Sequence, residues 1–469
     1  MKRLKVGVLF VTSNWFRQVG VQEEGGSLSA EVETIGREAV DRIAAFADTV
    51  YDGVLYSEQS ARAAARNILK QNVRVLVVSS LMWCEDQVLR AALSELPDLP
   101  VILFTLIPSR DLPPFLSYTR MLKGSGTVGS LQFSGMLRRE GRQYISLTGF
   151  YGDEGLYNSL GIHLKALELK EKLKSLKVGV LPFPCSQMST TYVDEFALRA
   201  AYGVELRYLE LARLKSLAEK VTLPEAAEFR RRIDASGIRV SVEEEELDWA
   251  IRSSLGLQKL SEAENISVMA MNDVTAEMHA ALGLRPSLFN PDFSGGDAVV
   301  SMEADIAAGI GLYLLKQLSG KPALYTEVLG LDIAENSLLL GHAGYHDAAL
   351  ADSSVPVKIV HDVEYKTSDR YKGACTCFKM RPGPVTLVNS VFHEKRFKWT
   401  AVSGESLPGP EKLEDTAHLM FRPVISVSSL IDCAVESGVS QHWLALPGDY
   451  LEELRILACW LPADLTVLS

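Results

Sequence analysis

The sequence predicts an α/β fold in which two doubly wound parallel-sheet domains are followed by a β-rich C-terminal domain. In the first third of the chain, short apolar runs alternate with longer amphipathic stretches. The opening run KVGVLF at residues 5–10 recurs as KVGVLP at residues 177–182, where the alternation begins again. After residue 355 the segments become short, rich in β-forming residues and separated by Pro and Gly. These changes predict three domains, at residues 1–174, 175–354 and 355–469.

The first domain is expected to contain a parallel sheet covered by helices on both faces. Its apolar runs are continuous, which is typical of strands buried on both sides. Helices between successive strands supply the crossover connections that a parallel sheet requires. The expected strands are residues 6–11, 53–56, 73–79 and 100–106, and the expected helices are residues 29–49, 57–72 and 85–96.

The second domain repeats this pattern with longer helices. Strands are expected at residues 177–181, 204–210 and 266–272, and helices at residues 191–201 and 304–318. The stretch 209–265 is rich in charged residues, and we expect it to be largely helical. The alternation again predicts a doubly wound sheet.

The third domain is expected to form an antiparallel sheet or a small barrel, because short strands are separated by turn residues. The expected strands are residues 355–363, 375–380, 385–392 and 396–402. The chain then ends with a strand at 442–446, a helix at 449–460 and a strand at 465–468.

Composition and charge exclude several classes of protein. The chain has 469 residues, 47% of them hydrophobic and 23% charged, which excludes a disordered chain. The net charge of −11 argues against nucleic-acid and anionic-membrane partners. The six cysteines are sparse, as is usual in a reducing cytoplasm. The first apolar run is too short for a secretion signal, and no apolar run reaches about 18 residues. We therefore expect a cytoplasmic protein without a membrane span.

A glycine motif in the first domain matches the dinucleotide-binding pattern G-x-G-x-x-G. The motif is Gly124-Ser-Gly126-Thr-Val-Gly129. A true cofactor loop follows its strand directly, whereas this motif stands well after the strand expected at 100–106. The sequence therefore favours a flexible Gly-rich connection and predicts no nucleotide cofactor.

Polar residues at the ends of three apolar segments form the most informative pattern. Glu303 follows the run at 299–302, Glu327 follows the run at 322–326, and His342 follows the run at 338–340. In α/β folds, ligands bind at the carboxyl ends of the strands. Carboxylate and imidazole groups at such ends are typical metal ligands. The pattern therefore indicates a metal site.

This ordered set resembles the L-arabinose and L-fucose isomerase superfamily of aldose–ketose isomerases. The matching segments are Met302-Glu-Ala-Asp305, Thr326-Glu327, Glu335-Asn336, Leu340-Gly-His342-Ala-Gly344 and Val439-Ser-Gln-His442-Trp. They cover most of the chain in the right order, and the order of the three domains is also similar. The resemblance implies an enzyme that moves a carbonyl group between C1 and C2 of a free pentose, hexose or deoxy sugar.

Carried over residue by residue, the resemblance implies that Glu303, Glu327, His342 and His442 bind a divalent metal. Glu303 and Glu327 would double as the acid/base pair that relays a proton through a cis-enediol. The mixed oxygen and nitrogen donors suit Mn²⁺ best, with Co²⁺ and Mg²⁺ as alternatives. The resemblance also implies a homo-oligomer, a trimer or hexamer, that binds a small-molecule sugar.

Further residues are weaker candidates for contacts with the sugar. Gln187, Met188 and Tyr192 follow the strand expected at 177–181. Asn272 ends the strand expected at 266–272. Trp83 follows the strand expected at 73–79, from which it would reach the site of a neighbouring subunit.

One departure from the superfamily keeps a second function open. Arabinose isomerases carry adjacent histidines in the C-terminal motif, whereas His442 here is flanked by Gln441 and Trp443. The alternative function is therefore a non-catalytic sugar-binding or regulatory protein on the same scaffold.

Overall fold

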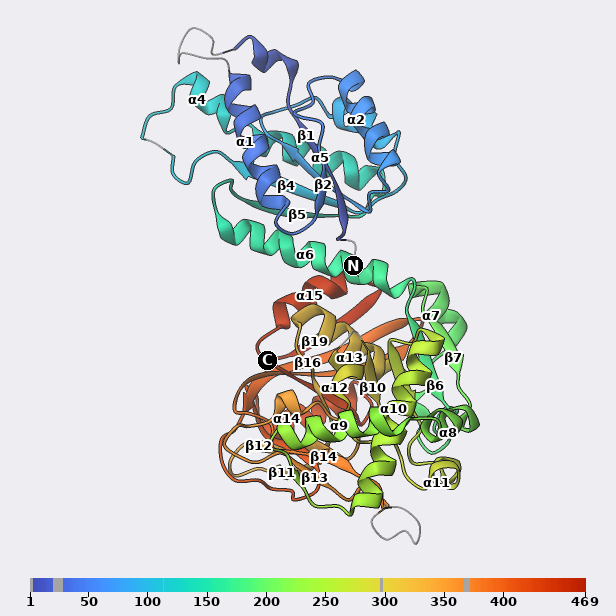
Figure 1. The fold of residues 1–469 in the computed structure, drawn as a ribbon. Coiled ribbons are helices and arrows are strands. Elements are labelled where there is room, and N and C mark those ends of the chain that lie inside the picture. The colour runs from blue at the N-terminus through green and yellow to red at the C-terminus, as the bar shows by residue number, and fades with distance from the viewer. Residues whose placement is uncertain (1–2, 20–27, 113, 296–297, 366–371) are drawn as a thin grey trace. The chain divides into compact units, whose positions relative to one another are not determined.

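The computed structural model describes residues 3–19, 28–112, 114–295, 298–365 and 372–469. The chain forms two compact units, Met1–Glu168 and Leu169–Ser469, coloured from blue to red along the chain in Figure 1. Each unit contains a parallel sheet with helices, and the second unit also contains an antiparallel barrel. This arrangement confirms the predicted fold class.

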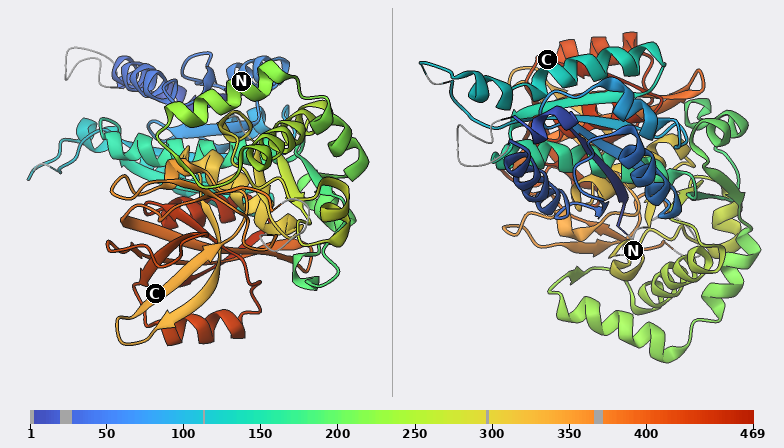
Figure 2. Two further views of the ribbon diagram at one scale, coloured as in Figure 1. Left: turned by 60° about the horizontal axis from the view of Figure 1, so that its bottom comes forward. Right: turned by 90° about the horizontal axis from the view of Figure 1, so that it is seen from above.

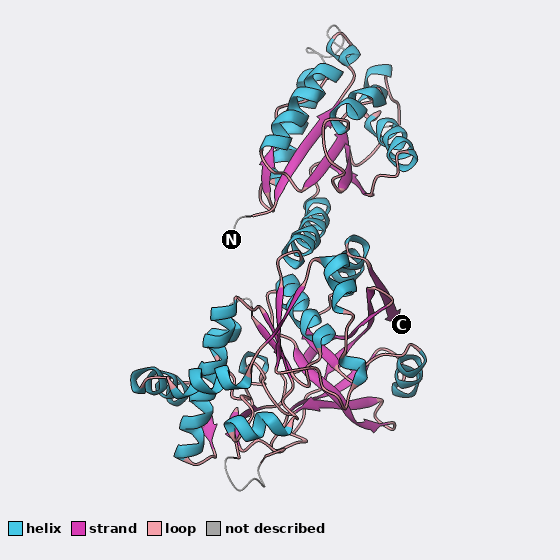
Figure 3. Cartoon of the chain, turned by 90° about the vertical axis from the view of Figure 1, so that its right-hand side faces the viewer, coloured by secondary structure: helices cyan, strands magenta, loops and turns pink. Residues whose placement is uncertain are grey.

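The first unit is a doubly wound α/β domain. Its five strands are parallel in the order β2-β1-β3-β4-β5, with helices on both faces of the sheet (Figure 3). One face packs on α2, α3 and α5, where Ala64, Leu89 and Phe133 share a buried core with Val78. The strands are β1 (Lys5–Val11), β2 (Asp48–Val50), β3 (Val75–Ser80), β4 (Val101–Ile107) and β5 (Tyr144–Phe150). The helices are η1 (Asn14–Arg17), α1 (Leu28–Ile43), α2 (Glu58–Lys70), α3 (Asp86–Leu93), α4 (Tyr118–Lys123), α5 (Gly126–Arg139) and α6 (Glu154–Leu173), the last residues of which belong to the second unit.

Two details of this unit correct the sequence-based prediction. The strand expected at 53–56 is wrong, because Leu55 there forms only an isolated bridge with Val11. The edge strand β2 lies earlier and overlaps the end of the helix expected at 29–49, whereas α1 ends at Ile43. Strand β5 is absent from the prediction, because none of its seven residues is fully buried and it lacks a continuous apolar run.

The glycine motif is part of a helix pair rather than the expected flexible connection. Gly124 ends α4, while Gly126 and Gly129 lie in the first turn of α5. A Cβ atom at Gly129 would lie 2.1 Å from Ser80 Oγ, and one at Gly126 would lie 2.5 Å from the Ser80 carbonyl oxygen. The two glycines therefore let α5 approach the end of β3 closely.

The second unit begins with a parallel sheet in the order β10-β9-β6-β7. Its strands are β6 (Lys177–Leu181), β7 (Glu205–Tyr208), β9 (Val268–Met271) and β10 (Val299–Ser301). Three of them coincide with the strands expected from the sequence. The helices are η2 (Ser189–Thr191), α7 (Glu195–Tyr202), α8 (Leu211–Glu219), α9 (Leu223–Ala235), α10 (Glu244–Glu264), α11 (Ala276–Leu282), α12 (Pro291–Gly295) and α13 (Ile306–Ser319).

A closed antiparallel barrel forms most of the rest of this unit (Figure 2). Six strands pair in the order β15-β18-β11-β12-β17-β16, and the β15–β16 pairing closes the ring. Strand β19 extends the sheet by pairing with β16 in parallel. The strands are β11 (Leu324–Asp332), β12 (Ser337–His342), β15 (Gly383–His393), β16 (Arg396–Ser406), β17 (Ala417–Pro423), β18 (Trp443–Pro447) and β19 (Ala463–Leu468).

Smaller elements complete the second unit. They are η3 (Ala348–Leu350), α14 (Val427–Glu436), α15 (Leu451–Trp460), and a small sheet of β8 (Arg239–Val240), β13 (Lys358–Val360) and β14 (Cys375–Cys377). Strands β11 and β12 precede residue 354, yet they pair with β18 and β17, which follow it. The division at residues 174 and 354 stays a prediction. None of the helices in the described part of the chain has the length and apolar character needed to span a bilayer.

The two ends of the glycine motif should respond differently to an added methyl group. Gly129→Ala forces a contact with Ser80, so we expect the free energy of unfolding of the first unit to fall by about 1–3 kcal/mol. Gly124→Ala is the matched control, because its nearest atom lies 3.5 Å away and its φ of −79° suits alanine. Urea unfolding of both variants checks this. Equal stability of the two variants would contradict the packing role.

Candidate metal centre

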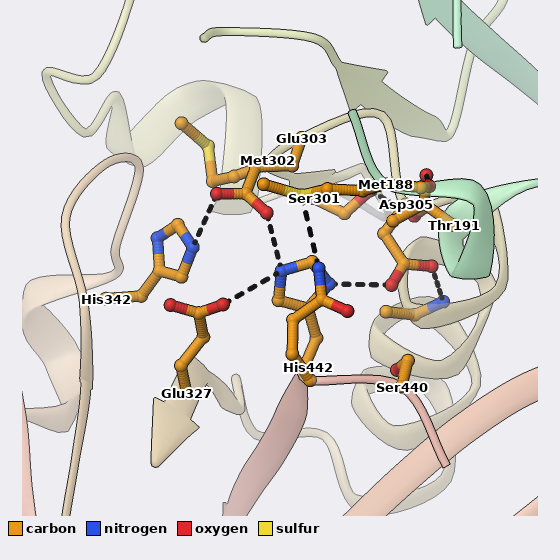
Figure 4. A network of polar contacts seen from close by, with 12 residues as sticks. Met188, Thr191, Ser301, Met302, Glu303, Asp305, Glu327, His342, Ser440 and His442 are labelled. Atoms are coloured by element: carbon orange, nitrogen blue, oxygen red, sulfur yellow. Dashed lines mark hydrogen bonds and ion pairs between the residues drawn. The ribbon is translucent and has the colours of Figure 1, made fainter. Parts of the chain in front are cut away.

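Four side chains from the parallel sheet and the barrel converge in the second unit. Glu303 follows β10, Glu327 lies on β11, His342 ends β12, and His442 immediately precedes β18. Figure 4 shows the four side chains pointing toward one another. One ligand atom from each lies within 4.8 Å of those from the others. Glu303 and both histidines are buried, whereas 33% of the Glu327 side chain is exposed.

Strand pairing in the barrel brings three of these residues together. On β11 and β18, Thr326 lies opposite Trp443, so Glu327 and His442 stand one position beyond this pair. On β11 and β12, Glu327 lies opposite Gly341, the neighbour of His342. Glu327 therefore lies inside β11 rather than after a strand end at residue 326, as the sequence had suggested.

Glu303 reaches the other three residues through an unusual backbone turn. Glu303 and Ala304 have φ values of +58° and +52°, and such left-handed conformations cost non-glycine residues about 1–3 kcal/mol each. The turn is held from both sides. The Ala304 N–H donates to the Met271 carbonyl at 2.9 Å, and the Tyr325 hydroxyl donates to the Met302 carbonyl at 3.2 Å. The surrounding structure thus maintains a strained turn that aims the Glu303 carboxylate at the histidines.

Hydrogen bonds define which nitrogen of each histidine faces the site. His342 Nδ1 lies 2.5 Å from the Ala343 carbonyl and donates to it, which turns Nε2 toward Glu303 Oε1 at 3.6 Å. His442 Nδ1 donates to Asp305 Oδ2 at 2.8 Å. His442 Nε2 lies 2.8 Å from Glu303 Oε2. In both rings Nε2 is the nitrogen directed at Glu303.

Asp305 links the orientation of His442 to the start of a helix. It is the N-cap of α13, where its Oδ1 accepts the Ala308 N–H at 2.9 Å. Its other oxygen holds His442. A carboxylate that fixes the second nitrogen of an imidazole is the usual support of a metal-binding histidine. Tyr325 adds packing, with its ring 5.0 Å from that of His342 and 4.7 Å from that of His442.

The contact between Glu303 and His442 shifts the pKa values of the two side chains in opposite directions. Burial raises the pKa of Glu303, but hydrogen bonds from His342 and His442 outweigh it and hold that pKa well below its usual range. Burial lowers the pKa of His442, but the bonds to Asp305 and Glu303 outweigh it and raise the value to about 9. One imidazolium faces the carboxylates of Glu303, Asp305 and Glu327. This excess of negative charge suits a cation.

The donor set fits a divalent metal ion. It offers carboxylate oxygens and imidazole nitrogens, a mixture that binds Mn²⁺, Co²⁺ and related ions. The supporting carboxylate on His442 is the additional feature expected around such a site. All four residues named by the sequence-based resemblance therefore come together in a group that could hold a metal ion.

The weaker candidates lie in several places. Met188 neighbours His442 in Figure 4, and its sulfur lies 3.1 Å from Gln441 Nε2. Gln187 and Tyr192 are exposed in the same segment, on either side of η2. Asn272 is buried, and its amide donates to the Phe183 carbonyl at 3.1 Å. Trp83 belongs to the first unit, where its indole N–H donates to Gln132 at 3.0 Å.

Two residues of the centre are missing from the sequence-based candidates. Asp305 appears in the motif Met302-Glu-Ala-Asp305 but has no assigned role there, and Tyr325 has none either. An Asp directly before an apolar helix is a recognisable cap signal. Its second contact, with a histidine 137 positions away, has no signal in the sequence.

Comparison with known proteins finds several isomerases that are similar in sequence to this chain. No protein-family model matches the chain. Three similar proteins are each named sulfoquinovose isomerase. The one from Priestia aryabhattai is 22% identical over 337 residues, which cover 71% of this chain and 73% of that protein. The one from Alkalicoccus urumqiensis is 21% identical over 391 residues (81% and 83%), and the one from Clostridium sp. strain MSTE9 is 22% identical over 311 residues (65% and 68%).

These similarities confirm that the chain is an enzyme of the isomerase class. They also support the broader prediction of a sugar isomerase, which implies a small-molecule sugar as its substrate.

Asp305→Asn should weaken metal binding without removing the helix cap. Asn retains an oxygen for the Ala308 N–H, but its neutral amide is a poorer partner for His442. We expect the affinity for Mn²⁺ to fall about 10–100-fold, measured by isothermal titration calorimetry.

The matched control is Asp194→Asn. Asp194 caps α7 through the same contact, to the Ala197 N–H at 2.9 Å, and should leave Mn²⁺ affinity unchanged. An equal loss in both variants would show that the effect comes from the cap alone.

Proposed function

We propose that the chain is a metal-dependent aldose–ketose isomerase, which interconverts a free aldose and its ketose through a cis-enediol. The observation that carries this proposal is the convergence of Glu303, Glu327, His342 and His442. The similarity to isomerases over most of the chain supports it. The candidate metal is Mn²⁺, with Co²⁺ and Mg²⁺ as alternatives.

The four donors would hold the ion, which, when bound, polarises the carbonyl and the neighbouring hydroxyl oxygen of the sugar. Isomerisation requires a proton to leave one carbon and a proton to return to the adjacent carbon. The two carboxylates serve as the acid/base pair for this transfer. Glu303 is anchored by both histidines. Glu327 is partly exposed, and its nearest ion-pair contact to His442 is 3.7 Å, so it is the carboxylate with more freedom to accept a proton.

The sugar is proposed at the level of a class. The resemblance to arabinose and fucose isomerases indicates a neutral pentose, hexose or deoxy sugar. The relatives named sulfoquinovose isomerase add a sulfonated hexose to the candidates. We further propose a homo-oligomer, by analogy with the superfamily, and a cytoplasmic location.

A non-catalytic sugar-binding or regulatory protein is the second candidate. It is favoured by Gln441, which stands beside His442 in place of a second histidine and contacts Met188 and Thr190. Such a protein has no requirement for a catalytic metal, so metal content separates the two functions.

Metal analysis should find about one ion per subunit in the protein supplied with Mn²⁺. The double variant Glu303→Gln, Glu327→Gln removes both carboxylates of the donor set and should lose that ion. Inductively coupled plasma mass spectrometry after desalting makes the measurement. Absence of metal from both proteins would contradict the isomerase and favour the sugar binder.

Glu327→Gln alone should lower kcat by about 10²–10⁴-fold, because an amide does not transfer the proton. The assay is ketose formation from L-arabinose, L-fucose and sulfoquinovose with added Mn²⁺. Glu335→Gln is the control, since Glu335 follows the same strand and 71% of its side chain is exposed. Full activity of Glu327→Gln would exclude the assigned acid/base role.

A further inference from the structure

A second cluster of charges lies beside the metal centre and outside its donor set. Its centre is Arg285, whose side chain is fully buried. Its Nε and Nη2 bond to the two oxygens of Asp362 at 2.5 and 2.7 Å, and its Nη1 contacts Asp273 and, at 3.0 Å, Glu364. Asp273 and Asp362 are also fully buried, whereas 38% of the Glu364 side chain is exposed.

A buried cluster of charges contributes little to the free energy of unfolding, so stabilising the fold does not by itself explain it. Ion pairs in the interior lose their hydration, and apolar side chains of similar volume often replace them at no cost in stability. Buried polar groups can instead specify one particular arrangement of the backbone. The atoms that the cluster contacts beyond itself indicate which arrangement that is.

Asp273 connects the cluster to the strained turn of the metal centre. Its Oδ2 faces Arg285, while its Oδ1 accepts the backbone N–H of Glu303 at 2.7 Å. Glu303 is the left-handed residue whose carboxylate contacts both histidines. The Asp273 carboxylate therefore bridges the Arg285 guanidinium and the backbone of the turn. In addition, the Tyr365 hydroxyl donates to the Asp273 carbonyl oxygen, which holds the backbone of Asp273.

We infer that Asp273, oriented by Arg285, is a positioning residue that holds Glu303 in the conformation needed to bind the metal. Asp273 does not touch the donor atoms, and it acts through the backbone of Glu303. The inference rests on the proposed metal-dependent function and deepens it, because it adds a buried residue that supports the backbone of Glu303. Arg285 holds one oxygen of the Asp273 carboxylate, which leaves the other directed at the turn.

Asp273→Asn is the decisive variant. The Asn amide has only one oxygen. If that oxygen accepts the Glu303 N–H, the amide NH₂ group faces Arg285, which offers no acceptor. We expect the Kd for Mn²⁺ to rise about 10–100-fold, measured by electron paramagnetic resonance of free Mn²⁺. At saturating Mn²⁺, the loss for the sugar that the wild-type enzyme converts should fall on kcat rather than on KM. An unchanged Kd in a folded Asp273→Asn variant would overturn the inference.

The matched control is Asp352→Asn, which weakens another buried ion pair, between Asp352 and Lys379 at 3.5 Å. It should lower stability in urea without changing Mn²⁺ affinity. If Asp273→Asn does not fold, the Kd of the Arg285→Lys variant for Mn²⁺ tests the inference instead. Lysine keeps the charge but cannot bond to Asp362 and Asp273 through separate nitrogens. A folded Arg285→Lys variant with the wild-type Kd would overturn the inference.

The outcomes also separate this inference from the proposed function. Wild-type protein that binds Mn²⁺ but converts no sugar contradicts the isomerase, while the Kd values still test Asp273. Wild-type turnover with unchanged Kd and kcat in Asp273→Asn overturns only the positioning role. Failure of the wild-type protein to bind any of Mn²⁺, Co²⁺ and Mg²⁺ overturns both.

Discussion

The candidate metal centre depends on the link between His442 and the turn that follows β10. Both ring nitrogens of His442 bond to carboxylates of that turn, Nδ1 to Asp305 and Nε2 to Glu303. His442 comes from the barrel, whereas the two acids come from the edge of the parallel sheet. One buried imidazole therefore connects the two halves of the second unit, and it does so with its charge neutralised at both ends.

The conformational cost of this centre is concentrated in two residues. Glu303 and Ala304 are left-handed without being glycine, and the contacts of Met271, Tyr325 and Asp273 with this short turn oppose that cost. Strain that persists because its surroundings impose it is a common property of functional sites. Here the strained turn directs the Glu303 carboxylate at the two histidines, and a relaxed turn would direct it elsewhere.

The barrel provides the opposite kind of support. Glu327 and His342 stand on adjacent antiparallel strands, and their separation is set by strand pairing rather than by strain. Glu327 is the partly exposed member of the set, while the other donors are buried. The candidate centre thus combines three buried side chains with one carboxylate that is partly exposed.

The sequence by itself determined the fold class and the residue types of the centre. Continuous apolar runs separated by helices are typical of a covered parallel sheet, and the repeated KVGVL segment marks where the second sheet begins. The sequence also identified Glu303, Glu327, His342 and His442, because their order along the chain resembles that in the arabinose and fucose isomerases. Each of these features is a short run or motif of neighbouring residues, so it can be recognised without knowing which segments meet in the folded protein.

Only the tertiary structure decided how these residues meet. The pairing of β11 with β18, the choice of imidazole nitrogen, the contact between Asp305 and His442, and the Arg285 cluster all join residues far apart in the chain. The positions of β2 and β5 were likewise missed, because short or half-exposed strands lack a continuous apolar run. Long-range register and side-chain orientation depend on packing, which no single segment of the sequence specifies.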